Sequence, residues 1–184
     1  VFGADPVESG TIVYKEKPFA PKSPQQALKA GIAMLAEDRK KLSLFMDQSI
    51  AFNMELSHLV KSGSVFVKRC VADKLHDTYI ESLGIKLHDR EDPVSSLSGG
   101  NQQKTVLARW LGTVPEMLIL DEPTHGVDVG AKAEIYRLIR RLALEGIGII
   151  LISSEMPELL TMSNRVAVMH HGRLRGILSG ARLT

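Results

Sequence analysis

The spacing of apolar residues along the chain predicts alternating strands and helices. Uninterrupted apolar runs of strand length occur at residues 32–35, 117–120 and 147–153, and such runs are typical of parallel strands buried on both faces. Residues 131–145 instead place their apolar side chains on one helical face. Strand, helix and strand at these lengths predict an α/β core with a parallel sheet.

Turn and capping residues extend this prediction toward both ends of the chain. Residues 11–15 have the composition of a short edge strand. Ser23 followed by Pro24 is typical of a helix N-terminus. Residues 166–169 and 174–178 flank a His-His-Gly-Arg turn, and together they predict a β-hairpin.

The middle of the chain has a different pattern. From about residue 44 to residue 87 apolar residues recur at helical spacing, and Gly63 and Gly84 mark breaks. Residues 101–111 predict a further helix. We therefore expect one domain, residues 1–184, that consists of an α/β core (residues 1–43 and 113–184) and an inserted α-helical subdomain (residues 44–112).

Composition limits the function classes only modestly. The formal net charge of the 184 residues is +2 and the basic residues are scattered, so no nucleic-acid partner is expected. The denser basic groups, residues 39–41 and 137–141, are predicted to be solvated surface. A single cysteine gives no disulfide framework. No apolar run approaches the ~18 residues of a membrane span, so any membrane association is expected to go through a partner.

Two carboxylates follow the apolar run of residues 117–120, in the segment MLILDEPT. Asp121 and Glu122 would lie at the C-terminal end of a parallel strand, where α/β sheets place their ligand sites. An aspartate there suits Mg²⁺ bound through water and phosphate oxygens. A second carboxylate can orient or deprotonate a water molecule. The alternative is an acidic pair that simply begins a loop.

A Ser-Gly-Gly sequence, residues 98–100, precedes the helix predicted at residues 101–111. Its backbone could approach an anion closely at the N-terminus of that helix. The segment is not the nucleotide-wrapping pattern G-x-x-x-x-G-K-[ST], because Gln103 stands before Lys104 where the pattern has glycine. The alternative is a Gly-rich loop capped by Asn101.

Together the two motifs resemble those of a known family. LSGGNQQK (residues 97–104) resembles the signature motif of ATP-binding cassette (ABC) transporter ATPases, and MLILDEPTHGVD (residues 117–128) resembles their Walker B strand and D-loop. With GIAMLAEDRKKLSLF (residues 31–45), the wording resembles the C-terminal cassette of tandem-cassette carbohydrate importers of the ribose, galactose and arabinose type. The resemblance covers essentially the whole chain and implies a P-loop NTPase-like fold.

The resemblance implies a role for each matching residue. Asp121 would be associated with Mg²⁺, and Glu122 would be the general base. Asp128 would be the D-loop aspartate at the interface of two cassettes. Glu37 would lie in the hinge loop before the helical subdomain, and Ser154 at the switch position. The residues implied to bind ATP held mainly by an opposing cassette are Ser98, Gly99, Gly100, Asn101 and Gln102.

Three features depart from the family pattern. No G-x-x-x-x-G-K-[ST] occurs anywhere in the sequence, which predicts an N-terminally truncated cassette without its Walker A loop. Glu37 stands where the family usually has glutamine, and Ser154 stands where it usually has histidine. A serine cannot carry the positive charge of an imidazolium, so weak catalysis is expected at this site.

The implied function is that of a nucleotide-binding subunit, or a fragment of one, which couples ATP binding and hydrolysis to carbohydrate import. Its cofactors would be ATP and Mg²⁺. Its partners would be a second cassette arranged head to tail, transmembrane permease subunits and, indirectly, a sugar-binding protein, at the cytoplasmic face of the cell membrane. The alternative is an inactive binding module that supplies only the signature surface in trans. These residues do not specify the sugar.

The remaining single residues predict structure rather than chemistry. Trp110 and Cys70 are expected to be buried, and His76 and His88 are expected on the surface. His125, which follows Thr124 inside the D-loop, either faces the cassette interface or is simply exposed.

Overall fold

The computed structural model describes residues 1–63 and 69–180. Its central sheet contains three parallel strands in the order β3-β4-β5. The strands are β3 (Ile32–Leu35), β4 (Met117–Asp121) and β5 (Gly148–Ile152). The parallel sheet predicted from the three apolar runs is therefore confirmed.

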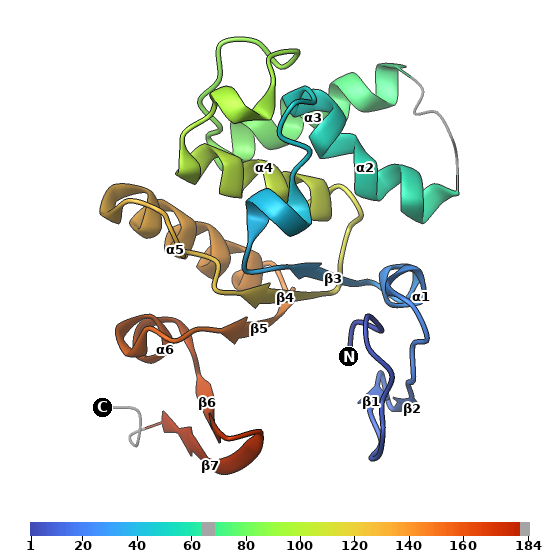
Figure 1. Ribbon diagram of the computed structural model, residues 1–184, viewed down its shortest axis with the longest axis vertical. Coiled ribbons are helices and arrows are strands. Elements are labelled where there is room, and N and C mark those ends of the chain that lie inside the picture. Colours follow the sequence, from blue (N-terminus) through green and yellow to red (C-terminus); the bar gives the residue numbers. More distant parts are fainter. Residues whose placement is uncertain (64–68, 181–184) are drawn as a thin grey trace.

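Helices cover one face of this sheet in two layers (Figure 1). The inner layer contains α4 (Gly99–Leu111) and α5 (Val129–Leu144). The outer layer contains α2 (Ile50–Ser62) and α3 (Arg69–Leu83). A short π-helix, η1 (Arg39–Ser43), leads from β3 into these layers, and a 3₁₀ turn, η2 (Val94–Ser96), precedes α4.

The helices predicted in the middle of the chain are confirmed, although residues 64–68 of that segment lie outside the described residues. The division into an α/β core and a helical subdomain at residues 43/44 and 112/113 stays a prediction. No helix in the described part of the chain has the length and apolar character needed to cross a bilayer.

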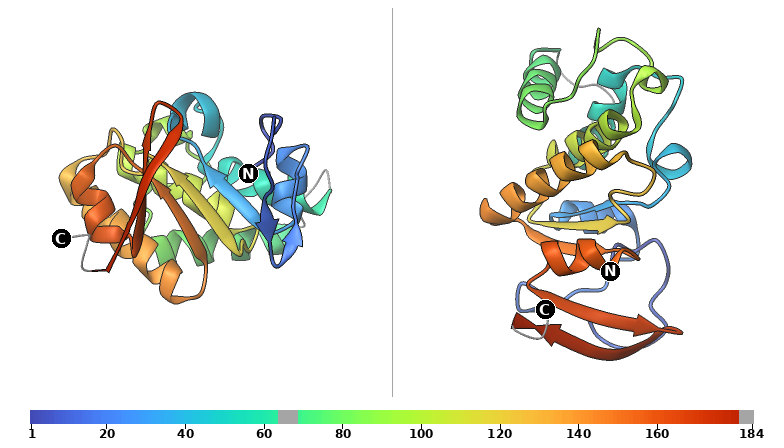
Figure 2. Two further views of the ribbon diagram at one scale, coloured as in Figure 1. Left: turned by 90° about the horizontal axis from the view of Figure 1, so that it is seen from below. Right: turned by 90° about the vertical axis from the view of Figure 1, so that its left-hand side faces the viewer.

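Two arms extend from the sheet on the side away from α4 and α5 (Figures 1 and 2). The N-terminal arm contains β1 (Val13–Tyr14), β2 (Lys17–Pro18) and α1 (Pro24–Lys29). The C-terminal arm contains α6 (Met156–Met162), β6 (Arg165–His170) and β7 (Arg173–Ser179). The predicted hairpin is confirmed as β6 and β7, and Ser23 caps α1 as expected, because its Oγ accepts a hydrogen bond from the Gln26 amide.

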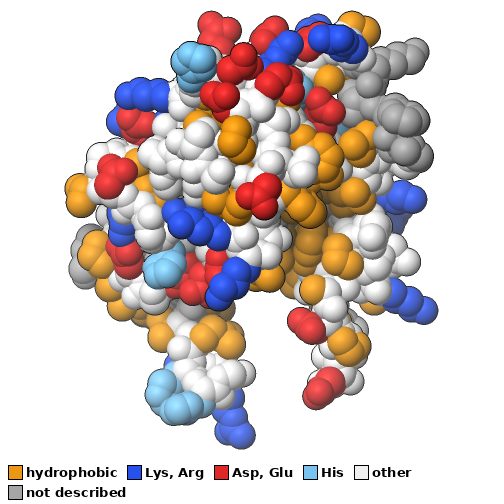
Figure 3. Space-filling view, turned by 45° about the horizontal axis from the view of Figure 1, so that its top comes forward, with side chains coloured by type: hydrophobic (Ala, Val, Ile, Leu, Met, Phe, Trp, Pro, Cys, Tyr) orange, Lys and Arg blue, Asp and Glu red, His pale blue; other side chains and the backbone are white. Residues whose placement is uncertain are grey.

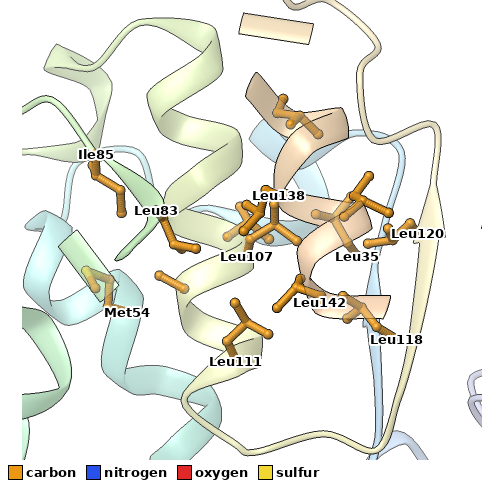
Figure 4. Close-up of a cluster of buried hydrophobic side chains, with 14 of the residues drawn as sticks. Leu35, Met54, Leu83, Ile85, Leu107, Leu111, Leu118, Leu120, Leu138 and Leu142 are labelled. Carbon is orange, nitrogen blue, oxygen red and sulfur yellow. The ribbon is translucent and has the colours of Figure 1, made fainter. Parts of the chain in front are cut away.

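Leucine side chains fill the space between the sheet and the helices (Figure 4). Leu35, Leu118 and Leu120 point from β3 and β4 into this core, where Leu107 of α4 and Leu138 of α5 meet them. All five are buried. Full burial of such a side chain stabilises a fold by ~1.5–3 kcal/mol, so packing on this helical face of the sheet stabilises the fold.

The opposite face of the sheet, called here the open face, is covered only in part. Ile32 and Ile119 are buried there by the N-terminal arm. On β5, however, Ile150 is 41% exposed and Ile152 is 46% exposed. The prediction that residues 147–153 form a strand buried on both faces is therefore wrong for this chain, because the described segments leave β5 only partly covered on the open face. Figure 3 shows the hollow between the two arms, with hydrophobic side chains above it.

Two buried cations on α4 fix this helix in the molecule. Arg109 donates from Nε to the Asn53 carbonyl (2.6 Å) and from Nη2 to Asn53 Oδ1 (2.8 Å), and it also donates to the carbonyl of Ser43. Burial lowers the pKa of Arg109 to about 10. Lys104 donates to the Gly84 carbonyl (2.9 Å) and pairs with Glu134 of α5 (2.6 Å). Lys104 of the Ser-Gly-Gly-Asn-Gln-Gln-Lys segment thus links α4 to α5 and to the residue that follows α3.

Candidate functional site

The N-terminus of α4 is formed by the Ser-Gly-Gly motif. The helix begins at Gly99, with Ser98 as its N-cap residue, so Asn101 is not the cap. The Ser98 side chain does not cap a backbone N–H group; its Oγ instead accepts a hydrogen bond from Asn101 Nδ2 at 3.0 Å. The Ser98 side chain therefore leaves the first-turn N–H groups without a side-chain cap, and such groups are suited to binding an anion.

The two glycines also have a packing role within the chain. A Cβ atom at Gly99 would lie 2.8 Å from Arg39 Nη2, and one at Gly100 would lie 2.6 Å from the Cβ of Ala131. Both distances are shorter than real Cβ contacts, so a side chain at Gly99 would displace the guanidinium of Arg39, and one at Gly100 would push α4 away from α5.

Three carboxylates interact electrostatically where the strands of the sheet end. Asp121 is the last residue of β4, Glu122 follows it, and Glu37 follows β3. Burial raises the pKa of Asp121, and the negative charges of Glu37 and Glu122 raise it further. A cation between carboxylates would relieve this repulsion, so the electrostatics of the strand ends fit a bound divalent metal ion.

Glu122 is held in a defined position. Its backbone is in the left-handed region, with φ at 46°, and its amide donates to the Ile152 carbonyl at 2.9 Å. One carboxylate oxygen, Oε1, accepts a hydrogen bond from the Ser154 amide at 2.6 Å. Ser154 therefore contacts Glu122 through its backbone, and the strained conformation is maintained from both sides.

Two other predicted site residues have structural contacts in this chain. Asp128 is the N-cap of α5, and its Oδ1 accepts from the Ala131 amide at 2.9 Å. Gln102 is 4% exposed, and its Nε2 donates to the Leu97 carbonyl at 3.1 Å. The Gln102 side chain thus supports the loop before α4, whereas Ser98 is exposed.

The structure also shows residues that the sequence pattern missed. Arg39, predicted to be solvated, is 9% exposed, and its guanidinium donates to two backbone carbonyls of the loop after β4. Burial lowers the pKa of Arg39, against an opposite effect of Asp38. Thr124 donates to the buried Glu158 at 3.1 Å, which ties the same loop to α6. No periodicity distinguishes these polar residues from surface ones.

Several single-residue expectations are settled by burial. His76 is 2% exposed and lies 3.0 Å from Glu55, so the prediction of a surface histidine is wrong; the side chain is enclosed between helices. Cys70 is exposed, contrary to the prediction of burial. Trp110 is half-buried against Phe2, and His88 is exposed as predicted. His125 is exposed as well.

The chemistry of the described arrangement fits phosphate and magnesium, but the described residues form no complete site for either. Among residues 1–63 and 69–180 no cluster of three or more ligating side chains could hold a metal ion alone. Magnesium commonly uses one or two carboxylates together with phosphate oxygens and water, which Asp121 and its neighbours fit. The N-terminus of α4 fits a phosphate group, while the nucleotide-wrapping pattern is absent from the sequence.

Relatives of this chain are found among curated transport proteins. The ribose import ATP-binding protein RbsA of Lactococcus lactis subsp. cremoris is 48% identical over 189 residues, which cover 100% of this chain and 38% of that protein. RbsA of Geobacillus kaustophilus is 47% identical over 179 residues, 97% of this chain and 36% of that protein. The chain thus spans well under half the length of these relatives.

Solved structures and a family model agree with this likeness. A nucleotide-free ATP-binding cassette from an ABC transporter superposes with a TM-score of 0.82 at 20% identity, over 99% of this chain and 74% of that one. The ADP conformation of the cassette MJ1267 also gives 0.82, at 21% identity over 98% and 74%. These superpositions confirm the predicted P-loop NTPase-like fold. The family model described as ABC transporter matches residues 1–125, and the chain belongs to this family.

Proposed function

We propose that this chain is part of the nucleotide-binding subunit of an ABC importer, which couples ATP binding and hydrolysis to carbohydrate uptake. The observation that carries the proposal is the uncapped N-terminus of α4, formed by residues 98–100 and packed against the loop after β4. The names of the relatives, ribose import ATP-binding proteins, favour a carbohydrate as the transported molecule.

In this proposal Ser98, Gly99 and Gly100 bind the γ-phosphate of ATP that an opposing cassette holds. Their N–H groups and the Ser98 hydroxyl donate to the anion. ATP with Mg²⁺, when bound, supplies the phosphoryl group that is transferred. In this chain's own half, Asp121 would hold the metal ion. Glu122, held by the Ser154 amide, would orient water and accept its proton.

We further propose that another polypeptide segment supplies the Walker A loop and covers the open face. Three observations support this step. The sequence contains no Walker A pattern, β5 has no second neighbour among the described strands, and Ile150 and Ile152 are exposed beside its edge. An apolar edge strand of this kind is normally paired or covered.

The remaining partners follow from the family. The proposal includes a second cassette arranged head to tail, permease subunits that span the membrane, and a sugar-binding protein reached through them. The chain would lie at the cytoplasmic face of the membrane, with Glu37 in the hinge loop and Asp128 near the cassette interface.

A second candidate function is a non-hydrolysing module that only supplies the signature surface in trans. Ser154 at the switch position favours it, because a serine side chain cannot carry a charge to a phosphate.

Glu122→Gln distinguishes the two functions once a Walker A segment is restored and the cassettes are assembled. A hydrolysing site predicts a near-complete loss of ATPase activity, about 10²-fold or more. The non-hydrolysing module predicts only a slight loss. Glu81→Gln, on the exposed surface of α3, is the control and should leave the rate unchanged. If both variants retain full activity, Glu122 has no role as a base.

A further inference from the structure

The guanidinium of Arg39 lies where three segments of the chain meet. Nη1 donates to the His125 carbonyl at 2.8 Å and Nη2 to the Gly126 carbonyl at 3.2 Å. The same Nη2 lies 2.8 Å from the position that a Cβ atom on Gly99 would occupy, closer than any other atom found around that position. One side chain therefore joins η1 to the loop after β4 and lies beside the first turn of α4.

The surroundings show why an arginine performs this task. Its acceptors are two successive backbone carbonyls, which match the fork of a guanidinium better than the single point of an ammonium. The carbonyls belong to a turn in which Gly126 has a φ of 66°. Arg39 is buried, whereas its neighbours Lys40 and Lys41 on η1 are exposed. This contrast on one short helix indicates that Arg39 is buried because its side chain bonds to the loop after β4.

The position of η1 couples the hydrogen bonds of Arg39 to movements of the helical layers. Arg39 is the second residue after Glu37, and the other end of η1 is held by Arg109 through the Ser43 carbonyl. A shift of the helical layers relative to the sheet therefore moves η1. Because Arg39 holds both carbonyls, the loop of residues 125–126 must follow or the two hydrogen bonds must break.

We propose that Arg39 is a positioning residue that keeps the first turn of α4 in register with the loop after β4. It acts on the signature glycines by filling the space that a side chain at Gly99 would occupy, and on the loop that leads to Asp128 through the two carbonyls. The geometry within the chain does not depend on the proposed function; only the consequence for ATP bound in trans rests on it.

Amide hydrogen exchange of the purified chain tests the geometry directly. Arg39→Gln removes the fork, and Arg39→Lys keeps the charge but can reach only one carbonyl. The reporters are the hydrogen-bonded amides of Gln102, His125 and Val127. In Arg39→Gln their exchange should become about tenfold faster, with a smaller change in Arg39→Lys. Lys40→Gln, on the same turn, is the matched control and should leave exchange unchanged.

The amides of the parallel sheet separate positioning from general destabilisation. The proposal predicts that sheet amides exchange at the wild-type rate in Arg39→Gln. If they accelerate by the same factor as the reporter amides, Arg39 supports only global stability and the proposal fails. Unchanged exchange at all three reporters also overturns it.

Gly99→Ala provides a second, independent variant. Its added Cβ displaces the guanidinium while the charge remains, so the reporter amides should again exchange faster. Combined with Arg39→Gln, the alanine has no guanidinium to displace and meets only the Gly126 carbonyl at 3.2 Å, so the double variant should be less than additive. Full additivity would show that the two residues act separately and would contradict the proposal.

The final arm concerns ATP held by a cassette with an intact Walker A loop. If the proposed function is right, adding the wild-type chain increases the ATP affinity of that cassette, and Arg39→Gln weakens the increase about tenfold while Lys40→Gln does not. If even the wild-type chain has no effect, the proposed function fails, whereas the exchange experiment still decides the role of Arg39. Equal effects of wild type and Arg39→Gln would overturn the consequence in trans.

Discussion

The two faces of the β3-β4-β5 sheet differ in what covers them, although the same strands form both. On the helical face, Leu118 and Leu120 are completely buried beneath α4 and α5. On the open face, Ile119 is buried by the N-terminal arm, yet Ile150 on the adjoining strand remains 41% exposed. An apolar strand sequence therefore predicts that both faces of the strand are buried, but it does not identify which segment packs on each face.

The candidate site follows the same division. The glycine pair and its supports belong to the helical face, where the chain itself supplies every contact described. The carboxylates at the strand ends lie at the border with the open face, where a metal ion and phosphate oxygens would complete the ligand set. Under the proposed function, this difference means that the helical face presents the signature surface, whereas the metal and nucleotide contacts at the strand ends need groups from outside the described chain.

The largest expected effect concerns the buried arginine behind the helical face. Arg109→Met leaves the Asn53 and Ser43 acceptors without their donor, and it should lower the free energy of unfolding by ~3 kcal/mol, measured by urea denaturation. Arg137→Met, at an exposed position on α5, should change it by less than ~0.5 kcal/mol. An unchanged midpoint for Arg109→Met would mean that desolvation of the guanidinium offsets its hydrogen bonds.

Packing of the signature helix gives the next effect. Gly100→Ala places a Cβ atom against Ala131 and should cost ~1–3 kcal/mol. Adding Ala131→Gly reopens the space and should recover part of the loss. Gly176→Ala, where nothing lies within 4 Å, serves as the control. If the Ala131→Gly change brings no recovery, the contact between α4 and α5 is not the cause.

How far the sequence predicts this molecule depends on local signals. Apolar runs predicted the three parallel strands, and Ser23 and the hairpin residues predicted local boundaries, because period and turn chemistry are local properties. Burial of polar side chains was not predictable. Arg39 and His76 resemble surface residues in sequence, and their burial depends on contacts with segments such as residues 125–126 that are distant along the chain.

The site was predictable to a similar extent. The motifs placed Asp121, Glu122 and residues 98–100 next to the correct strand and helix ends, since such placement follows from the elements themselves. The inward direction of Gln102 and the hydrogen bond between Ser154 and Glu122 arise from tertiary packing, which no spacing of residues expresses.

Two neighbouring isoleucines on β5 allow the most direct comparison of how much each face of the sheet contributes to stability. Ile149 packs against the core on the helical face, and Ile150 points to the open face. Ile149→Thr should lower the free energy of unfolding by ~1–2 kcal/mol, while Ile150→Thr should change it by less than ~0.5 kcal/mol and reduce self-association. Thermal unfolding and sedimentation measure both effects. Equal losses of stability would mean that the open face is covered in solution.

The smallest effect concerns the charge of Asp121. Because the pKa of Asp121 is raised in the folded chain, the folded chain holds the carboxyl proton of Asp121 more tightly than the unfolded chain does. The free energy of unfolding therefore falls as pH rises through the ordinary value of 3.8 and through the higher folded pKa. Asp121→Asn removes this fall and should raise the melting temperature near pH 7 by about 1–3 °C, with no gain below the ordinary pKa. A lower melting temperature at pH 7 would contradict the proposed repulsion.

The central claim is that the chain presents a phosphate-binding surface for ATP held elsewhere and has no complete nucleotide site. Calorimetric titration of Mg-ATP into the purified chain tests it most directly. The account predicts no saturable binding up to ~1 mM nucleotide, because the sequence contains no Walker A loop to enclose the phosphates. Saturable binding with a micromolar Kd would contradict it.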